Sequence, residues 1–340
     1  MKTSYEKILG CLVGGAAGDA MGAATEIRSR EQIREYFGGD VKTFKKPPMD
    51  TFGRGSEEGQ ITDDFSVAYV IAKKIAENGG KVDEEIAKQG LFEWSQVEKW
   101  FTRFAGPTTR ANLAKLKGEA VEDPNAFVPV NYNEQSSNGG GMKSAPIALF
   151  SGGDLDKAIQ DSITVSKLTH PNQIALSGAA AIAAATAAAM REGANLFDVV
   201  QAGIYGAQEG DRIGRQYHAN AGASVVGRIK LAVAIGLLSD NLDEAIDKIA
   251  AVIGSGLKAA EAVPAVFGLM VAAKGDTMDG IYAGVNVGDD TDTVATMIGG
   301  ILGALNGVDS MPADYTDYLE KQNGIELRKL AKDIEAIINK

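Results

Sequence analysis

Four glycines spaced four residues apart near the start of the chain, Gly10, Gly14, Gly18 and Gly22, constrain the fold more than any other feature of the sequence. Residues four apart lie on one face of an α-helix, so these glycines form a stripe that carries no side chains. Such a stripe lets a second helix approach closely. The 41 glycines of the chain and its many alanines predict that tightly packed short helices recur throughout.

Helical periodicity is found along most of the chain, whereas the alternating patterns typical of strands are scarce. In 65–76, for example, Phe65, Tyr69 and Ala72 lie near one face of the predicted helix. Similar patterns predict helices at 155–165, 174–190, 196–207, 221–238, 242–253, 259–272, 291–305 and 325–338. Because no linker or fixed-period repeat interrupts the series, we predict a single all-α domain over residues 1–340.

Charge, cysteine content and histidine content exclude several kinds of partner and site. With 34 Lys and Arg residues against 45 Asp and Glu residues, the chain has a formal net charge of −11. This charge repels phosphate at long range, so general binding of nucleic acids or anionic membranes is not expected. One cysteine, Cys11, and two histidines, His170 and His218, exclude a disulfide framework and a metal site built from Cys or His. A bound metal must therefore take mainly oxygen ligands.

A short apolar run near the start of the chain, at 8–17, resembles the core of a signal peptide. Glu6 and Lys7 precede it directly, and Asp19 ends it far below the ~20 residues that a membrane-spanning helix needs. We therefore expect no signal peptide and no membrane segment here, and predict a cytoplasmic protein.

Two acidic clusters are placed where a loop ends and an apolar helix is predicted to begin. They read Thr62-Asp63-Asp64 and Asp289-Asp290-Thr291-Asp292-Thr293. In one interpretation they are helix caps, because threonine and aspartate cap helices well and acidic residues suit the helix dipole. In the other they bind a metal, because crowded carboxylates repel one another and resist burial until a cation neutralises them. Carboxylate and hydroxyl oxygens suit Mg²⁺, Mn²⁺ or Ca²⁺.

Five short motifs follow one another in the order found in one enzyme family. They are Gly18-Asp19-Ala20-Met21-Gly22 followed by Glu26, Gly59-Gln60-Ile61-Thr62-Asp63-Asp64, Asn138-Gly139-Gly140-Gly141-Met142-Lys143 followed by Pro146, His170-Pro171, and Gly288-Asp289-Asp290-Thr291-Asp292-Thr293. In this order they resemble the GDxxG…E, GxxTDD, NGxxMR…P, His-containing and GGDTDT segments of the ADP-ribosylglycohydrolase family. The resemblance covers about residues 8–307.

The resemblance implies a fold, a cofactor and an activity. The fold is a compact orthogonal bundle of many helices that holds two adjacent Mg²⁺ or Mn²⁺ ions. The activity is hydrolysis of an ADP-ribosyl glycosidic bond by a metal-activated water, on an ADP-ribosylated protein or a small ADP-ribosyl metabolite. The implied metal ligands are Thr62, Asp63, Asp64, Asp290, Asp292 and Thr293. The candidate general acid or base residues are Glu26 and Asp63, and the implied substrate-binding residues are Asn138, Gly139, Gly140, Gly141, Met142, Lys143 and His170.

Taken without the resemblance, several of these residues have ordinary structural interpretations. Glu26 can be an exposed acid after a helix, the glycines can form a flexible surface loop, Lys143 can be solvated, and His170 can cap a helix or be half-buried. Three departures from the family pattern, Phe65 for Thr, Lys143 for Arg and Asp289 for Gly, leave hydrolysis of another ribosyl or nucleoside-like bond as an alternative. A non-catalytic ADP-ribose-binding relative is a further alternative, against which the complete ligand set argues.

Overall fold

The computed structural model describes residues 4–119 and 133–340, and every regular element in these two ranges is helical. The predicted all-α fold class is thereby confirmed. In chain order the elements are α1 (Ser4–Gly22), α2 (Arg30–Phe37), α3 (Asp63–Glu77), α4 (Glu84–Ser95), α5 (Glu98–Phe104), α6 (Pro107–Leu116), η1 (Asn138–Gly140), α7 (Ser144–Ala148), η2 (Leu149–Ser151), α8 (Leu155–Ser166), α9 (Gln173–Met190), α10 (Leu196–Gly214), α11 (Val225–Leu238), α12 (Leu242–Val252), α13 (Ala259–Ala272), α14 (Thr277–Asn286), α15 (Thr291–Asn306), η3 (Val308–Ser310), α16 (Tyr315–Asn323) and α17 (Leu327–Ile338), where η marks a 3₁₀ helix.

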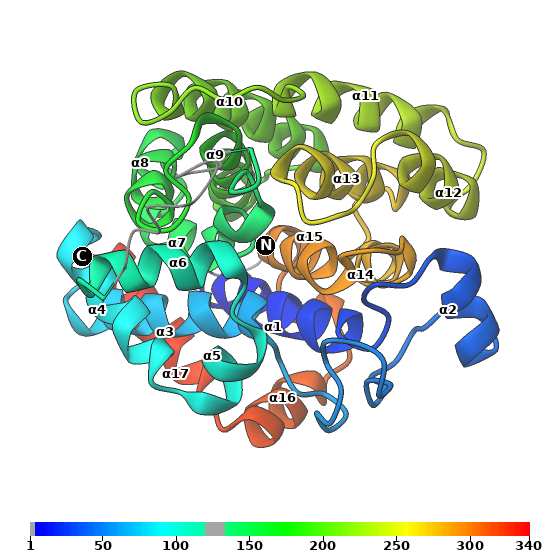
Figure 1. The fold of residues 1–340 in the computed structure, drawn as a ribbon, viewed down its shortest axis with the longest axis horizontal. Coiled ribbons are helices and arrows are strands. Elements are labelled where there is room, and N and C mark those ends of the chain that lie inside the picture. Colours follow the sequence, from blue (N-terminus) through cyan, green and yellow to red (C-terminus); the bar gives the residue numbers. More distant parts are fainter. Residues whose placement is uncertain (1–3, 120–132) are drawn as a thin grey trace, which may run out of the picture.

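The glycine stripe lies on α1, and its partner is α15, beside α1 in the middle of the molecule (Figure 1). A Cβ atom added at three of the stripe's glycines would lie within 2.2 Å of a backbone carbonyl oxygen of α15. The pairs are Gly10 with Gly303, Gly14 with Gly299, and Gly18 with Ala295. The facing residues of α15 are therefore small as well, and the two backbones touch over several turns. The predicted close helix approach is confirmed.

This contact also decides where the second acidic cluster lies. At the end of the stripe, a Cβ atom at Gly22 would lie 2.4 Å from the Cα atom of Asp292. The first turn of α15 thus rests directly on the last turn of α1. The packing of the two helices positions the Asp292 backbone beside the loop that follows α1.

Helix α9 forms a second centre of packing. All of its residues except Met190 at the end are buried, and α10 packs along it through glycines whose added Cβ atoms would approach α9 carbonyl oxygens at 2.2 Å (Gly206) and 2.5 Å (Gly210). Within the described residues, α9 is the one helix that has the length and the mean hydropathy, 1.5, to cross a membrane. Burial of nearly the whole helix inside the protein is what the core helix of a packed domain shows.

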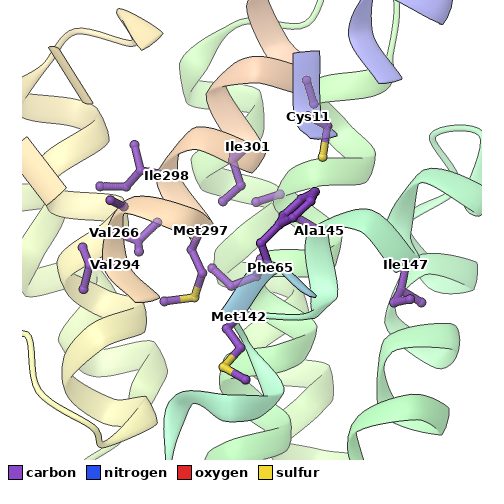
Figure 2. Packing of buried hydrophobic residues seen from close by; sticks show 14 of the residues in the cluster. Cys11, Phe65, Met142, Ala145, Ile147, Val266, Val294, Met297, Ile298 and Ile301 are labelled. Atoms are coloured by element: carbon purple, nitrogen blue, oxygen red, sulfur yellow. The ribbon is translucent and has the colours of Figure 1, made fainter. Parts of the chain in front are cut away.

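A hydrophobic cluster extends beneath the two acidic helix starts (Figure 2). Phe65 of α3 lies in it against Gly15 of α1, with Met142 and Met297 nearby. The single cysteine, Cys11, is fully buried in the same cluster. Burial raises the pKa of its thiol, so the side chain acts as a small apolar group.

Candidate active site

The first acidic cluster begins α3, and a carboxylate from α1 caps this helix. Asp19 is fully buried and accepts hydrogen bonds from the backbone N–H groups of Thr62, at 3.0 Å to each oxygen, and of Phe65, at 2.9 Å. The Thr62 hydroxyl accepts a further bond from the N–H of Asp64 at 3.2 Å. The open amides of this helix start are thus satisfied by Asp19 and Thr62. The capping interpretation is right for Thr62, but it does not account for the carboxylates of Asp63 and Asp64.

The second acidic cluster begins α15, and its carboxylates do little capping. Asp290 occupies the N-cap position without a capping hydrogen bond from its side chain. Its Oδ2 atom instead accepts a hydrogen bond of 2.5 Å from Nδ2 of Asn138. The Thr293 hydroxyl donates to Oδ2 of Asp64, also at 2.5 Å, and so joins the two clusters directly. Asp292 accepts the N–H of the adjacent Thr293 at 3.1 Å.

Glu26 reaches the same place through a turn. Helix α1 ends at Gly22, so the helical face that Glu26 would share with Asp19 in a longer helix does not exist. Instead, the chain turns back, and carboxylate oxygens of Glu26, Asp290 and Asp292 lie within 4.8 Å of one another. All three side chains are buried, with Glu26 only 9% exposed. The interpretation of Glu26 as an exposed acid is therefore wrong.

Backbone strain accompanies this arrangement. The N–H of Ile27 donates to the carbonyl of Asp289 at 2.7 Å, and the N–H of Asp289 donates to the carbonyl of Arg28 at 2.9 Å. Both Ile27 and Asp289 adopt left-handed backbone conformations, with φ of 62° and 61°. A β-branched residue rarely adopts this conformation, which costs on the order of 1–3 kcal/mol. The strain lies on the two segments that carry Glu26 and Asp290.

Crowding and burial determine the electrostatics of the centre. Burial raises the pKa of Asp19 to about 7 and, together with the charges of Asp19 and Asp290, raises the pKa of Asp63 to about 8. The pKa values of the remaining carboxyls are raised too, chiefly by burial and, in addition, by nearby carboxylates; these are Glu26, Asp64, Asp290 and Asp292. Without a bound cation, these six carboxyls cannot all be ionised near neutral pH. A cluster of buried oxygen donors of this kind fits a hard divalent cation such as Mg²⁺ or Mn²⁺.

The glycine-rich loop packs against its surroundings. A Cβ atom at Gly139 would lie 2.8 Å from the His170 ring, and one at Gly141 would lie 3.0 Å from the sulfur of Met297. The glycines at 139–141 are all buried, so the interpretation as a flexible surface loop is wrong. The Met142 side chain lies in the core (Figure 2), so a contact with substrate would have to come from its backbone. Substrate binding by this loop stays a prediction.

Lys143 is fully buried, so the interpretation as a solvated lysine is wrong. Its Nζ atom donates hydrogen bonds to the carbonyl of Gly139 at 2.6 Å and to the hydroxyl of Thr169 at 3.2 Å. Burial lowers its pKa to about 8, although Asp63 and Asp64 act in the opposite direction. Both bonds go to protein atoms, so Lys143 braces the glycine-rich loop from within.

His170 is also fully buried, and another residue, Asn172, caps α9. The interpretation of His170 as a capping or half-buried residue is therefore wrong. Its Nδ1 atom lies 2.8 Å from the Thr169 hydroxyl, and its Nε2 atom lies 2.9 Å from the hydroxyl of Ser137. Burial and the nearby Lys143 hold its pKa well below the usual value, so the ring is neutral. Its contact with substrate stays a prediction, because both nitrogens already have protein partners.

Comparison with known sequences identifies the scaffold. The profile of the ADP-ribosylglycohydrolase family matches residues 1–340. The chain belongs to this family. It is therefore a hydrolase of the glycosidase type, from a metal-dependent family, and its acidic cluster can hold such a metal.

Several relatives align over nearly the whole chain. The uncharacterised protein YegU of Escherichia coli (strain K12) is 28% identical over 97% of this chain and 96% of its own length. Human ADP-ribosylhydrolase ARH3 is 23% identical over 99% and 95%, and the ADP-ribosylarginine hydrolase Tri1 of Pseudomonas putida (strain GB-1) is 24% identical over 97% and 78%. A solved structure titled ADP-ribosylglycohydrolase-related protein complex covers 99% of both chains with a TM-score of 0.69 at 21% identity, which shows the shared fold.

The three departures from the family pattern differ in where they lie. The Phe65 side chain is buried in the core, and Lys143 is buried behind the glycine-rich loop. Only Asp289 is exposed, and its left-handed backbone explains why glycine suits this position. Two of the three substitutions therefore change packing, and their side chains do not face solvent.

Two residues with evident roles in this site were not predicted from the sequence. Asp19 belongs to a quoted motif, but its function as the cap of α3 depends on a contact between two helices. Ser137 precedes the glycine-rich loop, and no spacing in the sequence marks its pairing with His170. The carboxylates, by contrast, were predicted, and Glu26 joins them as a candidate metal ligand.

Proposed function

We propose that this protein hydrolyses the bond between the ribose of ADP-ribose and an acceptor group, and that it uses two Mg²⁺ or Mn²⁺ ions. The observation that carries the proposal is the convergence of Glu26, Asp290 and Asp292 within 4.8 Å. Asp64, which accepts a hydrogen bond from the Thr293 hydroxyl, extends the same cluster. Membership of the ADP-ribosylglycohydrolase family supports ADP-ribosyl hydrolase activity, and the names of the ARH3 and Tri1 relatives agree with it.

The residues that would hold the ions are Thr62, Asp63, Asp64, Asp290, Asp292 and Thr293, together with Glu26. Divalent cations held there would supply Lewis-acid chemistry, which orients ribose hydroxyls and lowers the pKa of a bound water. The protein arranges its ligands in advance: Asn138 orients Asp290, and Thr293 orients Asp64. Asp19 fixes the first turn of α3, which carries Asp63 and Asp64.

The carboxylates also suit the chemistry at the anomeric carbon. As the bond to the acceptor breaks and the bond to water forms, positive charge develops on the ribose ring, and nearby carboxylates stabilise it. The leaving group takes up a proton while the attacking water loses one. Asp63 and Glu26 are our candidates for proton transfer. Their pKa values are raised in the metal-free protein, and a cation bound beside them would lower these values, so the carboxylate that does not ligate an ion is the one able to carry the proton.

We further propose that the acceptor is an amino-acid side chain, with ADP-ribosylarginine as the first to test, because Tri1 is named for it. Peptides carrying ADP-ribose on arginine or on serine should be incubated with the protein in Mg²⁺, in Mn²⁺ or in EDTA, and free ADP-ribose measured. We expect release from at least one peptide with metal and none in EDTA. Undiminished release in EDTA, or no release from any conjugate by metal-loaded protein, would contradict the proposal. Equal hydrolysis of simple nucleosides would favour the nucleoside-like alternative.

A further inference from the structure

A cavity of about 420 Å³ lies between helix α5 and the loop that leads into the first acidic cluster. The loop contributes Gly55 and Ile61 to its wall, and α5 contributes Arg103. Ile61 directly precedes Thr62, which caps α3. The cavity therefore adjoins the helix start that carries part of the acidic centre.

The same loop packs on the turn that carries Glu26. A Cβ atom at Gly53 would lie 2.9 Å from the carbonyl oxygen of Ala23, just after α1. Beyond Glu26, the guanidinium of Arg28 donates a hydrogen bond of 2.6 Å to the carboxylate of Asp50. The loop thus connects the wall of the cavity with the segment that brings Glu26 into the acidic centre.

Two guanidinium groups meet at the cavity without an acidic partner. Their hydrogen bonds go to backbone carbonyls of the loop, from Arg103 to Gly53 at 3.4 Å and from Arg54 to Thr51 at 3.3 Å. Glu98 lines the cavity as well, but it forms no ion pair with either arginine. Within residues 4–119 and 133–340, no carboxylate lies within ion-pair distance of the two guanidinium groups.

This arrangement is unusual for an acidic chain and is electrostatically unfavourable. Other arginines, such as Arg30 and Arg328, pair with two or more carboxylates. Burial and the charge of Arg54 both lower the pKa of Arg103. Because arginine keeps its proton in proteins, the repulsion persists until an anion neutralises it. The guanidinium of Arg103 lies 5.2 Å from the centre of the Phe104 ring, and its planar fork suits a carboxylate or a phosphate.

Exposed apolar side chains on the same loop favour a polypeptide as the source of this anion. Met49 is 75% exposed and Phe52 is 56% exposed, shortly before Arg54. Methionine, aromatic residues and arginine are the residue types enriched in protein interfaces. The glycine-rich loop, where the ADP-ribosyl group is expected, belongs to another region, in which η1 packs on α8, α9 and α13. The cavity is therefore better suited to the acceptor than to ADP-ribose.

We infer that the cavity between α5 and the loop at 53–56 binds an oxoanion of the acceptor polypeptide, a carboxylate or a phosphate close to the ADP-ribosylated residue. Arg54 and Arg103 donate the hydrogen bonds, and Met49 and Phe52 contact neighbouring apolar residues of the polypeptide. The protein consequently prefers modified residues in acidic surroundings. The inference rests on the proposed function, because it takes an ADP-ribosylated protein as the substrate.

Matched peptides that carry the ADP-ribosyl conjugate test this preference, with the modified residue flanked by glutamate, by phosphoserine or by glutamine. In Mg²⁺, we expect kcat/KM for at least one anionic peptide to exceed that for the glutamine peptide roughly fivefold or more, because charge-assisted hydrogen bonds to two arginines exceed an exposed ion pair. The difference should lie in KM, since the arginines touch no reacting atom. The better of the two anionic peptides identifies the source as a carboxylate or a phosphate.

Variants assign the preference to the cavity. Arg103→Gln and Arg54→Gln each remove one exposed guanidinium, so the ratio of kcat/KM between anionic and glutamine peptides should fall towards one. Arg212→Gln is the matched control, because Arg212 is an exposed arginine on α10 that pairs with Glu209, and it should keep the wild-type ratio. Circular dichroism checks that all three variants fold.

The possible outcomes separate the inference from the proposed function. If the wild-type protein cleaves all three peptides with equal kcat/KM, or if both cavity variants keep the full preference, the inference fails and the proposed function stands. If metal-loaded wild-type protein cleaves no conjugate, the proposed function fails and the inference fails with it.

Discussion

The helix starts of α3 and α15 carry similar acidic sequences but are built in opposite ways. At α3, Thr62 and the buried Asp19 satisfy the open backbone amides, and the backbone there avoids left-handed conformations. At α15, the Asp290 side chain makes no capping bond, and Asp289 just before it has a φ of 61°. The start of α3 is stabilised by hydrogen bonds to its open amides, whereas at the start of α15 a strained backbone holds carboxylates that make no capping bond.

The difference teaches how to separate capping from metal binding. Acidic residues at a helix start are explained by capping only when their oxygens accept the open N–H groups. By that measure, capping accounts for Thr62 and Asp19 at α3. The carboxylates that remain, such as Asp290 and Glu26, gather in a buried cluster, which is costly unless a cation neutralises it. We therefore expect variants of the capping residues Asp19 and Thr62 to affect folding, and variants of the carboxylates that do not cap to affect chemistry.

The largest expected effect is on activity at α15. Asp292→Asn removes a carboxylate from the cluster but keeps its shape, so we expect kcat/KM for the cleaved conjugate to fall roughly 10³-fold. Circular dichroism should show an unchanged fold. Asp83→Asn is the matched control, because Asp83 caps α4 and asparagine caps a helix equally well. Full activity in Asp292→Asn would show that this carboxylate is dispensable.

The second effect concerns stability at α3. Asp19→Ala leaves the buried N–H groups of Thr62 and Phe65 without acceptors, so we expect a loss of about 3 kcal/mol in the free energy of unfolding. Asp83→Ala, which removes a cap that is only half-buried, should cost only about 1 kcal/mol. Urea denaturation in EDTA measures both. Equal losses in the two variants would mean that Asp19 is an ordinary cap.

The third prediction is that the stability of the metal-free protein falls as the pH rises. The folded-state pKa values of Asp19, about 7, and Asp63, about 8, lie above the ordinary value of 3.8. Between pH 3.8 and these raised pKa values, the folded state therefore binds more protons than the unfolded state. The contribution of the two carboxyls to the free energy of unfolding is complete below about pH 4 and is lost as the pH rises through 7 to 8.

Urea denaturation from about pH 7 to about pH 8.5 in EDTA, above the range in which His170 of the unfolded chain takes up a proton, should show a decrease of at least about 1.4 kcal/mol, which corresponds to one pKa unit for one group. Saturating Mg²⁺ should reduce the decrease, because a bound cation compensates for ionisation of the carboxyls. A free energy of unfolding that rises with pH over this range in EDTA would contradict the claim that these carboxyls are buried without a compensating charge.

The smallest expected effect tests the strain at α15. Asp289→Gly places glycine in a left-handed conformation, so we expect a gain of about 0.5 kcal/mol in unfolding free energy. Gly288→Ala is the opposite change, because Gly288 has a φ of 94° and a Cβ atom there would lie 2.9 Å from the carbonyl oxygen of Arg28. It should destabilise the protein. A stability loss in Asp289→Gly would show that the Asp289 side chain contributes more than its backbone costs.

Long and regular patterns allowed much of the fold to be predicted. Every helix expected from periodicity, such as the one predicted at 174–190 and observed as α9, is present in the structure. Helices without a predicted pattern are short or rely on contacts with distant segments. Helix α2, for example, has eight residues and is held by ion pairs from Arg30 to Asp243 and Asp247. Helix α14 contains two glycines, which weaken the helical signal.

The candidate site was predicted in its residue types but not in its contacts. The two acidic clusters were evident because carboxylates at such density are rarely needed for capping. Burial of Lys143 and His170 depends on segments far away in the sequence, so their solvated or half-buried interpretations failed. Glu26 joins Asp290 and Asp292 only because a strained turn follows α1, and no helical spacing expresses that turn.

The central claim is that the carboxylates that make no capping hydrogen bond bind divalent cations. Calorimetric titration of Mn²⁺ into the metal-free protein tests this claim most directly. We predict saturable binding of two Mn²⁺ ions per chain to the wild-type protein and to the Asp83→Asn control. Asp292→Asn should lose at least one of them. Equal binding by the wild-type and Asp292→Asn proteins, or no binding by the wild-type protein, would contradict the account.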